Sequence, residues 1–133
     1  MKDIYIYPAI LSYADDGVSI DFPDLPGCLP YADTTEKAIK NAKEAMGLHL
    51  WSMERDNDDI PNPTDISALE FEQYQIIIMV DVFMPPIRER QNNRFVKKTL
   101  SIPSWLNAEA EYAGVNFSQL LQTSLKEHLG ISQ

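Results

Sequence analysis

Hydrophobic and polar side chains alternate over much of the first thirty residues, which predicts β-strands there. Residues 4–13 are apolar at both alternate sets of positions, as expected for a strand that is covered on at least one side. Pro8 interrupts this strand, and because proline has no N–H to donate, we expect either a bulge or a sheet edge there. The Asp-Gly pair at 16–17 favours a tight hairpin turn, and residues 18–22 predict the returning strand.

A rigid loop and a long helix are predicted next. Two prolines and one glycine restrict the backbone of the loop over residues 22–28. A brief third strand is expected over residues 29–32. The spacing of apolar residues then predicts a helix from about residue 34 to 53, and Asp33 and Glu36 have the spacing of a capping box. Alanines on the apolar side would let this helix lie close to a sheet.

The next apolar run, residues 75–84, predicts a fourth strand that is buried on both faces. Pro85 and Pro86 follow this run and are expected to end the strand. We expect residues 85–93 to form a polar linker. The predicted order of elements is therefore β-β-β-α-β over residues 1–84, which is an α+β domain.

A second, smaller module is predicted over residues 94–133, and it opens with another alternating strand at 96–102. One face of that strand carries Val96, Leu100 and Ile102, and the other carries Lys97, Thr99 and Ser101. Lys98 falls on the apolar face, where its stem can lie at the edge while the ammonium group reaches water. Pro103 ends the strand, because it cannot donate a ladder hydrogen bond.

Two short helices are expected after this strand. One is predicted over residues 104–113, and Gly114 then stands where a left-handed residue is needed. The second begins with Asn116 or Ser118 as its N-cap and ends at Gly130. One strand and two short helices bury too little apolar surface to fold alone, and a lone strand leaves its backbone unpaired. Two copies that pair their strands would solve both problems, so we expect a homodimer through this module.

The composition is that of a globular protein. The chain has 133 residues, of which 44% are hydrophobic. Its single cysteine, Cys28, excludes an internal disulfide. No apolar run is long enough to span a membrane, and Lys2 and Asp3 precede a short strand instead of a signal peptide. We therefore expect a cytoplasmic protein that does not interact with membranes.

The net charge of −9 is distributed unevenly along the chain. Residues 1–93 carry seven basic and seventeen acidic side chains, whereas residues 94–133 carry four basic and three acidic ones. Three of those four cations lie at the predicted strand: Arg94, Lys97 and Lys98. This division suggests two partners, DNA for the C-terminal module and a basic protein for the acidic body, residues 1–93. Acidity that only keeps the protein soluble is the alternative reading.

The C-terminal module resembles the ribbon-helix-helix family of DNA-binding proteins. The resemblance rests on the strand that ends in Ile102-Pro103, the turn over residues 114–118 and the leucine-rich second helix. It implies that the polar strand face enters the major groove of operator DNA as a two-stranded ribbon. The base-contacting residues would be Lys97, Thr99 and Ser101. The same resemblance places a phosphate at the start of the second helix. Its contacts would be Asn116, Phe117 and Ser118.

The two modules together resemble the HicB-type antitoxins of type II toxin–antitoxin systems. The N-terminal part carries this resemblance in its hairpin strands, in the loop over residues 22–28 and in the alanine-rich helix after Thr34-Thr35-Glu36. The resemblance implies a truncated RNase H-like domain over residues 1–84, followed by a dimeric ribbon-helix-helix module over 94–133. It also implies an antitoxin that binds and neutralises a HicA-type mRNA-cleaving toxin and represses its own operon.

An RNase H-like fold raises the alternative of a metal-dependent nuclease, which needs several converging carboxylates. The candidate carboxylates are Asp21, Asp24, Asp33 and Asp81. Asp21 alternates with inward-facing residues and is therefore expected to face solvent, and the first strand has no carboxylate after Asp3. His49 and His128 lack the neighbouring cysteines of a zinc site. We therefore expect no catalytic site, no metal and no cofactor.

The acidic body is the part expected to bind the toxin, by covering its catalytic and RNA-binding face. The candidate contact residues are Asp21, Asp24 and Leu25. A further alternative stays open at this point: a ligand-sensing ribbon-helix-helix repressor that has no toxin partner. A ligand that changes the affinity for DNA would distinguish that repressor from an antitoxin.

Overall fold

The computed structural model describes residues 1–131, and contacts between residues divide the chain into two units, Met1–Arg94 and the residues from Phe95 onward. The first unit contains an antiparallel four-stranded sheet in the order β3-β2-β1-β4. Its strands are β1 (Ile4–Ala14), β2 (Gly17–Asp21), β3 (Tyr31–Ala32) and β4 (Gln75–Phe83). The chain therefore has the mixed α+β character that its sequence predicts, with the order β-β-β-α-β.

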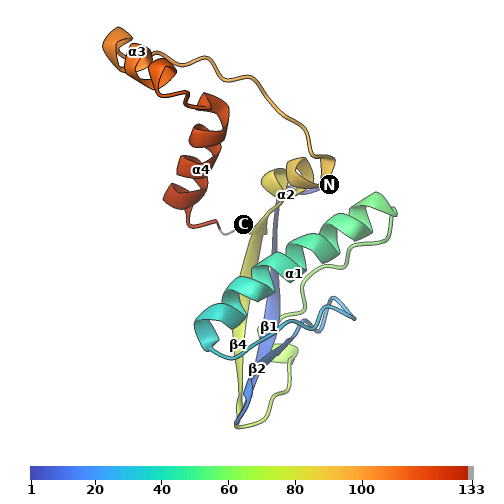
Figure 1. The fold of residues 1–133 in the computed structure, drawn as a ribbon. Helices are drawn as coiled ribbons and strands as arrows, with labels where there is room; N and C mark the ends of the chain where they lie inside the picture. The colour runs from blue at the N-terminus through green and yellow to red at the C-terminus, as the bar shows by residue number, and fades with distance from the viewer. Residues whose placement is uncertain (132–133) are drawn as a thin grey trace. The chain divides into compact units, whose positions relative to one another are not determined.

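Helix α1 (Thr35–Arg55) covers one face of this sheet (Figure 1). Alternate residues of β1 and β4 point toward it, and every fourth or third residue of α1 points back. The central contacts of this core come from Tyr5, Tyr7, Leu11, Val80 and Val82 in the sheet and from Ala38, Ala42, Met46 and Leu50 in the helix. Because two of those helix residues are alanines, the axis of α1 lies close to the strands. The side chain of Thr34 caps the helix by accepting from the Lys37 amide, so the cap lies one residue after the expected Asp33.

The opposite face of the sheet has no helix over it within the first unit, and this corrects the prediction that β4 is buried on both faces. Met79 and Phe83 of β4 are 45% and 57% exposed, and Ile4 and Ile6 of β1 share that outer face with them. An antiparallel sheet can leave one face open in this way. The apolar composition of β4 did not reveal which of its two faces α1 covers.

Pro8 lies at a sheet edge and not at a bulge. The register between β1 and β4 runs without interruption through the pair Pro8↔Met79. The pairing between β1 and β2 begins only at Ile10↔Asp21, so the first half of β1 has a neighbouring strand on one side alone. The missing N–H of Pro8 is therefore accommodated where β1 is an edge strand.

Residues 84–92 form a helix, α2 (Met84–Asn92), where the sequence was expected to form a linker over 85–93. Pro85 and Pro86 stand in the first helical turn, where amides have no partner inside a helix and the fixed φ of proline suits the helix. The proline pair thus starts a helix as well as ending a strand. Ile87 of α2 packs so closely on Gly47 of α1 that a Cβ at residue 47 would clash with it.

The second unit contains two helices, α3 (Ser104–Tyr112) and α4 (Phe117–Leu129). Gly114 follows α3 with a φ of +73°, as predicted, and Gly130 ends α4 with a φ of +70°. Residues 94–103 are neither helix nor strand in this single chain. The strand over 96–102, which was expected to pair with a second copy of the chain, stays a prediction. In the part of the chain that is described, no helix has the length and apolar character needed to cross a bilayer.

Candidate functional site

Asp21, Asp24 and Leu25, the residues expected to contact a toxin, have three different environments. Asp21 is exposed at the end of β2. The carboxylate of Asp24 accepts hydrogen bonds from the Thr64 amide (3.0 Å) and hydroxyl (2.5 Å), so it ties the loop over 22–28 to a distant segment. The Leu25 side chain is fully buried in the core. Asp24 and Leu25 therefore hold the loop in place, and Asp21 is the exposed member of the three.

The carboxylates considered for a nuclease do not converge. Asp21 and Asp81 lie on the same outer face of the sheet, but Asp21 pairs with Ile10 and Asp81 with Ile6. Four residues of strand separate these two levels, which corresponds to roughly 13 Å along the strand. Asp81 also lies 3.3 Å from the Lys43 ammonium group. Over residues 1–131, no three side chains of the metal-ligating types come together.

Cys28 is a free cysteine that is buried in the core. Burial, together with the smaller effect of the nearby Asp21 carboxylate, raises the pKa of its thiol to about 11. The thiolate that would act as a nucleophile is therefore scarce near neutral pH.

Arg88 joins three segments of the first unit. Its guanidinium donates to both Glu54 carboxylate oxygens, at 3.0 and 2.8 Å, and to Asp3 Oδ1 at 2.8 Å. It also donates to the Lys2 carbonyl at 2.5 Å. The Tyr5 hydroxyl adds a hydrogen bond to Glu54 at 3.2 Å. The Glu54 side chain is only 4% exposed, and its hydrogen bonds from Arg88 hold its pKa below the ordinary value.

The residues expected to read DNA bases lie in the segment that has no regular structure in one chain. Lys97, Thr99 and Ser101 are all exposed. The apolar residues that alternate with them are exposed as well: Val96 86%, Leu100 60% and Ile102 46%. Large apolar side chains that are left this exposed are typical of an interaction surface.

The start of α4 matches its expected geometry. Asn116 is the N-cap, and its Oδ1 accepts from the Gln119 amide at 3.0 Å. The backbone amides of Phe117 and Ser118 stand in the first turn, where a helix has no internal partner for them. The Ser118 hydroxyl accepts from Gln122 at 3.2 Å. Two amides and the positive end of the helix dipole are thus available for an anion at this position.

The second unit, as far as it is described, shows no buried core in a single chain. Over residues 95–131 not one side chain is buried, although α3 and α4 carry large apolar groups. Examples with more than half of their surface exposed are Trp105, Leu120 and Leu129. Apolar helices that bury nothing on their own need a partner surface to be stable.

Comparison with known proteins identifies the family of the chain. The model of the HicB_like antitoxin of bacterial toxin-antitoxin system matches residues 7–124. The chain belongs to this family. A relative of the HicB-like antitoxin is the uncharacterized 14.9 kDa protein in the rep-hol intergenic region of Haemophilus phage HP1, which is 36% identical over 81 residues. That match covers 58% of this chain, and the chain spans 60% of the length of this curated relative.

Among the solved structures that resemble the HicB-like chain are two toxin–antitoxin complexes. One is a toxin–antitoxin complex from Streptococcus pneumoniae, with a TM-score of 0.60 and 24% identity over 94% of this chain and 99% of that one. The other is a HicA3 and HicB3 toxin–antitoxin complex, with a TM-score of 0.50 and 25% identity over 59% of this chain and 98% of that one. The first likeness supports the fold of most of the chain.

The arginine–glutamate contact between α2 and α1 is a feature of this HicB-like chain that sequence reasoning missed. A signal was present, because proline in the first turn followed by Arg88, Glu89 and Arg90 is compatible with a helix. The preceding strand ends at the same prolines, and that favoured the interpretation as a linker. The partner Glu54 lies 34 residues earlier in the sequence, so no local pattern could indicate it.

Proposed function

We propose that this chain is the antitoxin of a toxin–antitoxin pair: it binds and neutralises a HicA-type mRNA-cleaving toxin and represses its own operon. Membership of the HicB-like antitoxin family carries the first half of this proposal. The solved relative named as a HicA3 and HicB3 complex supports a HicA-type protein as the partner.

Neutralisation is assigned to the first unit because of its charge. Residues 1–94 have nine more acidic than basic side chains, and an RNA-cleaving partner must carry a cationic surface to bind its substrate. An acidic surface that covers the toxin would exclude RNA from the same cations. Asp21 is exposed and is retained as a candidate contact, and no chemistry by the antitoxin is required.

Operator binding is assigned to the second unit, acting as a homodimer with the ribbon-helix-helix arrangement. The unburied helices and the exposed apolar positions at 96, 100 and 102 support pairing with a second copy. Lys97, Thr99 and Ser101 would then face the major groove, and the start of α4 would hold a phosphate through Asn116, Phe117 and Ser118.

Co-expression tests the neutralising half of this function. The fragment should comprise residues 1–94, because α2 packs on α1 and a fragment that stops at residue 84 would lose the Arg88 contacts. We expect residues 1–94 to restore growth to cells that express the proposed HicA-type partner. The fragment from 95 onward is the control and should not do so. Continued toxicity despite a soluble, folded 1–94 fragment would contradict the assignment.

A further inference from the structure

The first half of β1 presents an unpaired backbone edge. β4 pairs with β1 from Ile4 to Ser12, whereas β2 pairs with it only from Ile10 to Ala14. On the side of β2, residues 4–9 therefore have no neighbouring strand. Unpaired strand edges are the sites at which another extended chain can add to a sheet.

Hydrogen bonds elsewhere in the sheet establish which residues of β1 direct their backbone N–H and C=O groups to this edge. The Ile20 amide donates to the Pro30 carbonyl at 2.9 Å, on the β3 side, so Asp21 turns its backbone groups toward β1 and its partner Ile10. The Tyr13 amide donates toward β4, to the Tyr74 carbonyl. Backbone direction alternates along a strand. The backbone N–H and C=O groups of the even-numbered residues of β1 therefore point away from β4.

Ile4 and Ile6 accordingly direct an N–H and a carbonyl to the open edge. Among residues 1–131, neither has a hydrogen-bond partner on that side. Pro8 is the next residue that faces this edge, and it offers only its carbonyl because it has no N–H. The open edge therefore has two residues, Ile4 and Ile6, that each offer both an N–H and a carbonyl, and it ends at Pro8.

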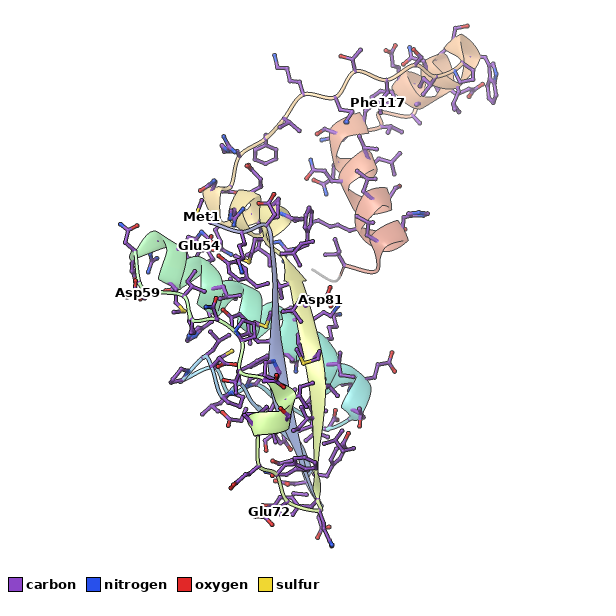
Figure 2. The ribbon with its side chains drawn as sticks, turned by 180° about the vertical axis from the view of Figure 1, so that it is seen from behind. Met1, Glu54, Asp59, Glu72, Asp81 and Phe117 are labelled. Carbon is purple, nitrogen blue, oxygen red and sulfur yellow. The ribbon has the colours of Figure 1, made fainter. Side chains whose placement is uncertain are left out.

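A cleft of about 580 Å³ lies beside this edge. One side of it is formed by residues 4–7 of β1 and the other by residues 57–63, which follow α1. The Tyr7 hydroxyl donates to the Pro61 carbonyl at 2.5 Å and fixes the second side relative to the strand. Met1, Glu54 and Asp59 mark this end of the first unit in Figure 2. The cleft therefore borders the two free backbone sets.

The chemistry of the cleft indicates what would fill it. Ile60, Pro61 and Pro63 provide apolar surface. Asp58 and Asp59 line the same side, are exposed and have no ion pair among the described residues. The Glu54 carboxylate is already neutralised by Arg88, and Lys2 is the cationic side chain of the lining. An extended segment with alternating apolar and basic side chains complements this surface. A second copy of the acidic unit does not, because it would bring further carboxylates to Asp58 and Asp59.

We propose that an extended, basic segment of the partner toxin adds to β1 along Ile4–Tyr7, in the cleft beside residues 57–63. It would occupy the position that β2 would have if β2 continued past Asp21. Backbone hydrogen bonds to Ile4 and Ile6 would hold the segment, and Asp58 and Asp59 would select its cations. This assignment rests on the proposed function, because the toxin supplies the strand.

Two variants of the full chain separate the two contributions. Ile6→Pro removes one N–H from the open edge and leaves the backbone hydrogen bonds to β4 unchanged. Pro8, two residues later, shows that the strand accepts a proline whose missing N–H would face this edge. The double variant D58N/D59N removes two negative charges from the cleft. D15N/D16N is the matched control, since it removes the same charge from the distant hairpin turn. Urea unfolding establishes that each variant is folded.

We expect Ile6→Pro to bind the purified toxin about tenfold more weakly, and D58N/D59N to weaken binding several-fold at low salt. D15N/D16N should stay within about twofold of the unaltered chain. Hydrogen exchange provides a second readout that needs no substitution: the Ile4 and Ile6 amides should exchange quickly in the free antitoxin and become protected in the complex.

The assignment is overturned if both amides exchange equally fast in the free chain and in the complex, or if folded I6P and D58N/D59N bind as tightly as D15N/D16N. Protection of these amides in the free chain that is lost on toxin binding would also overturn it, because a second copy would then occupy the edge. An unaltered chain that does not bind the toxin at all would instead refute the proposed function, and the assignment with it.

Discussion

Arg88 is the residue that attaches α2 to the rest of the first unit. Its contacts with Glu54, Asp3 and the Lys2 carbonyl join the end of α1, the start of β1 and α2. Because the Glu54 side chain is almost fully buried, its charge depends on Arg88 for compensation. Removal of one member of such a pair leaves a buried charge without a partner, which is strongly destabilising.

We therefore expect Arg88→Met to lower the free energy of unfolding by about 3 kcal/mol at pH 7. The hydrogen bonds from Arg88 lower the pKa of Glu54, so their contribution is present above the ordinary glutamate pKa of 4.5 and is lost as the pH falls through the depressed value. The cost of the substitution should accordingly shrink toward pH 3. Urea unfolding of the full chain at both pH values measures this difference.

Arg94→Met is the matched control for that experiment. Arg94 also forms an ion pair, with Glu89, but both side chains are exposed to water. Exposed pairs contribute little because water and salt screen them. No measurable loss of stability is expected from R94M. Equal effects of R88M and R94M would show that the Glu54 contact does not hold α2 in place.

At the scale of the elements, the hairpin and the helices were predictable because their signals are local. The inward residues Val18, Ile20 and Phe22 follow from alternation, and the turn follows from Asp16-Gly17. Asn116 and Gly130 mark the ends of α4 as their residue types predict. In such cases the neighbouring residues in the sequence are sufficient to predict the local structure.

The errors have a different physical origin. Pro85-Pro86 suits both the end of a strand and the start of a helix, and the choice depends on Gly47 and Glu54, which are distant in sequence. β4 is apolar on both sides, but α1 covers one of them only. Leu25 was a candidate toxin contact, and nothing in a proline-rich loop indicates that this side chain enters the core.

The strand predicted over 96–102 would pair with a second chain, and its register is a prediction to be tested on DNA. With Lys97, Thr99 and Ser101 facing the groove, Thr99→Ala should weaken operator binding by about 1 kcal/mol or more for each lost base contact, twice per dimer. Asn116→Ala should weaken binding to operator and random duplex about equally, because phosphates carry no sequence information. Titrations of both duplexes at one fixed salt concentration measure these effects.

Lys98→Ala is the control for the register, because Lys98 would lie on the face of the strand opposite to the groove-facing residues. It should affect affinity less than Lys97→Ala does. The register would be displaced by one residue if folded dimers of K98A and L100A lost operator recognition while K97A and T99A kept it.

At the scale of the whole molecule, the chain combines an acidic unit that has its own core with a second unit whose three basic and three acidic side chains balance and whose described residues form no core. The first unit buries seventeen hydrophobic residues of the sheet, α1 and the segments around them. Among residues 95–131, no side chain is buried. The first unit is therefore expected to fold alone, and the second to fold by association.

Deletion of residues 95–133 should consequently convert a dimer into a monomer. The full chain should have about twice its mass of 15.1 kDa in light scattering at micromolar concentration, and the 1–94 fragment the mass of a single copy. Urea unfolding of the fragment should remain cooperative, since its core is intact. A full chain that is monomeric at this concentration would contradict both the dimer and the ribbon.

The central claim, that this HicB-like chain neutralises an mRNA-cleaving toxin by binding it, is tested most directly by RNA cleavage in vitro. The proposed HicA-type partner is purified and mixed with an mRNA, and the full chain is titrated into the reaction. The account predicts that cleavage falls in proportion to the added antitoxin and stops near one copy for each toxin. Cleavage that continues at the same rate with the folded chain in large excess would contradict it.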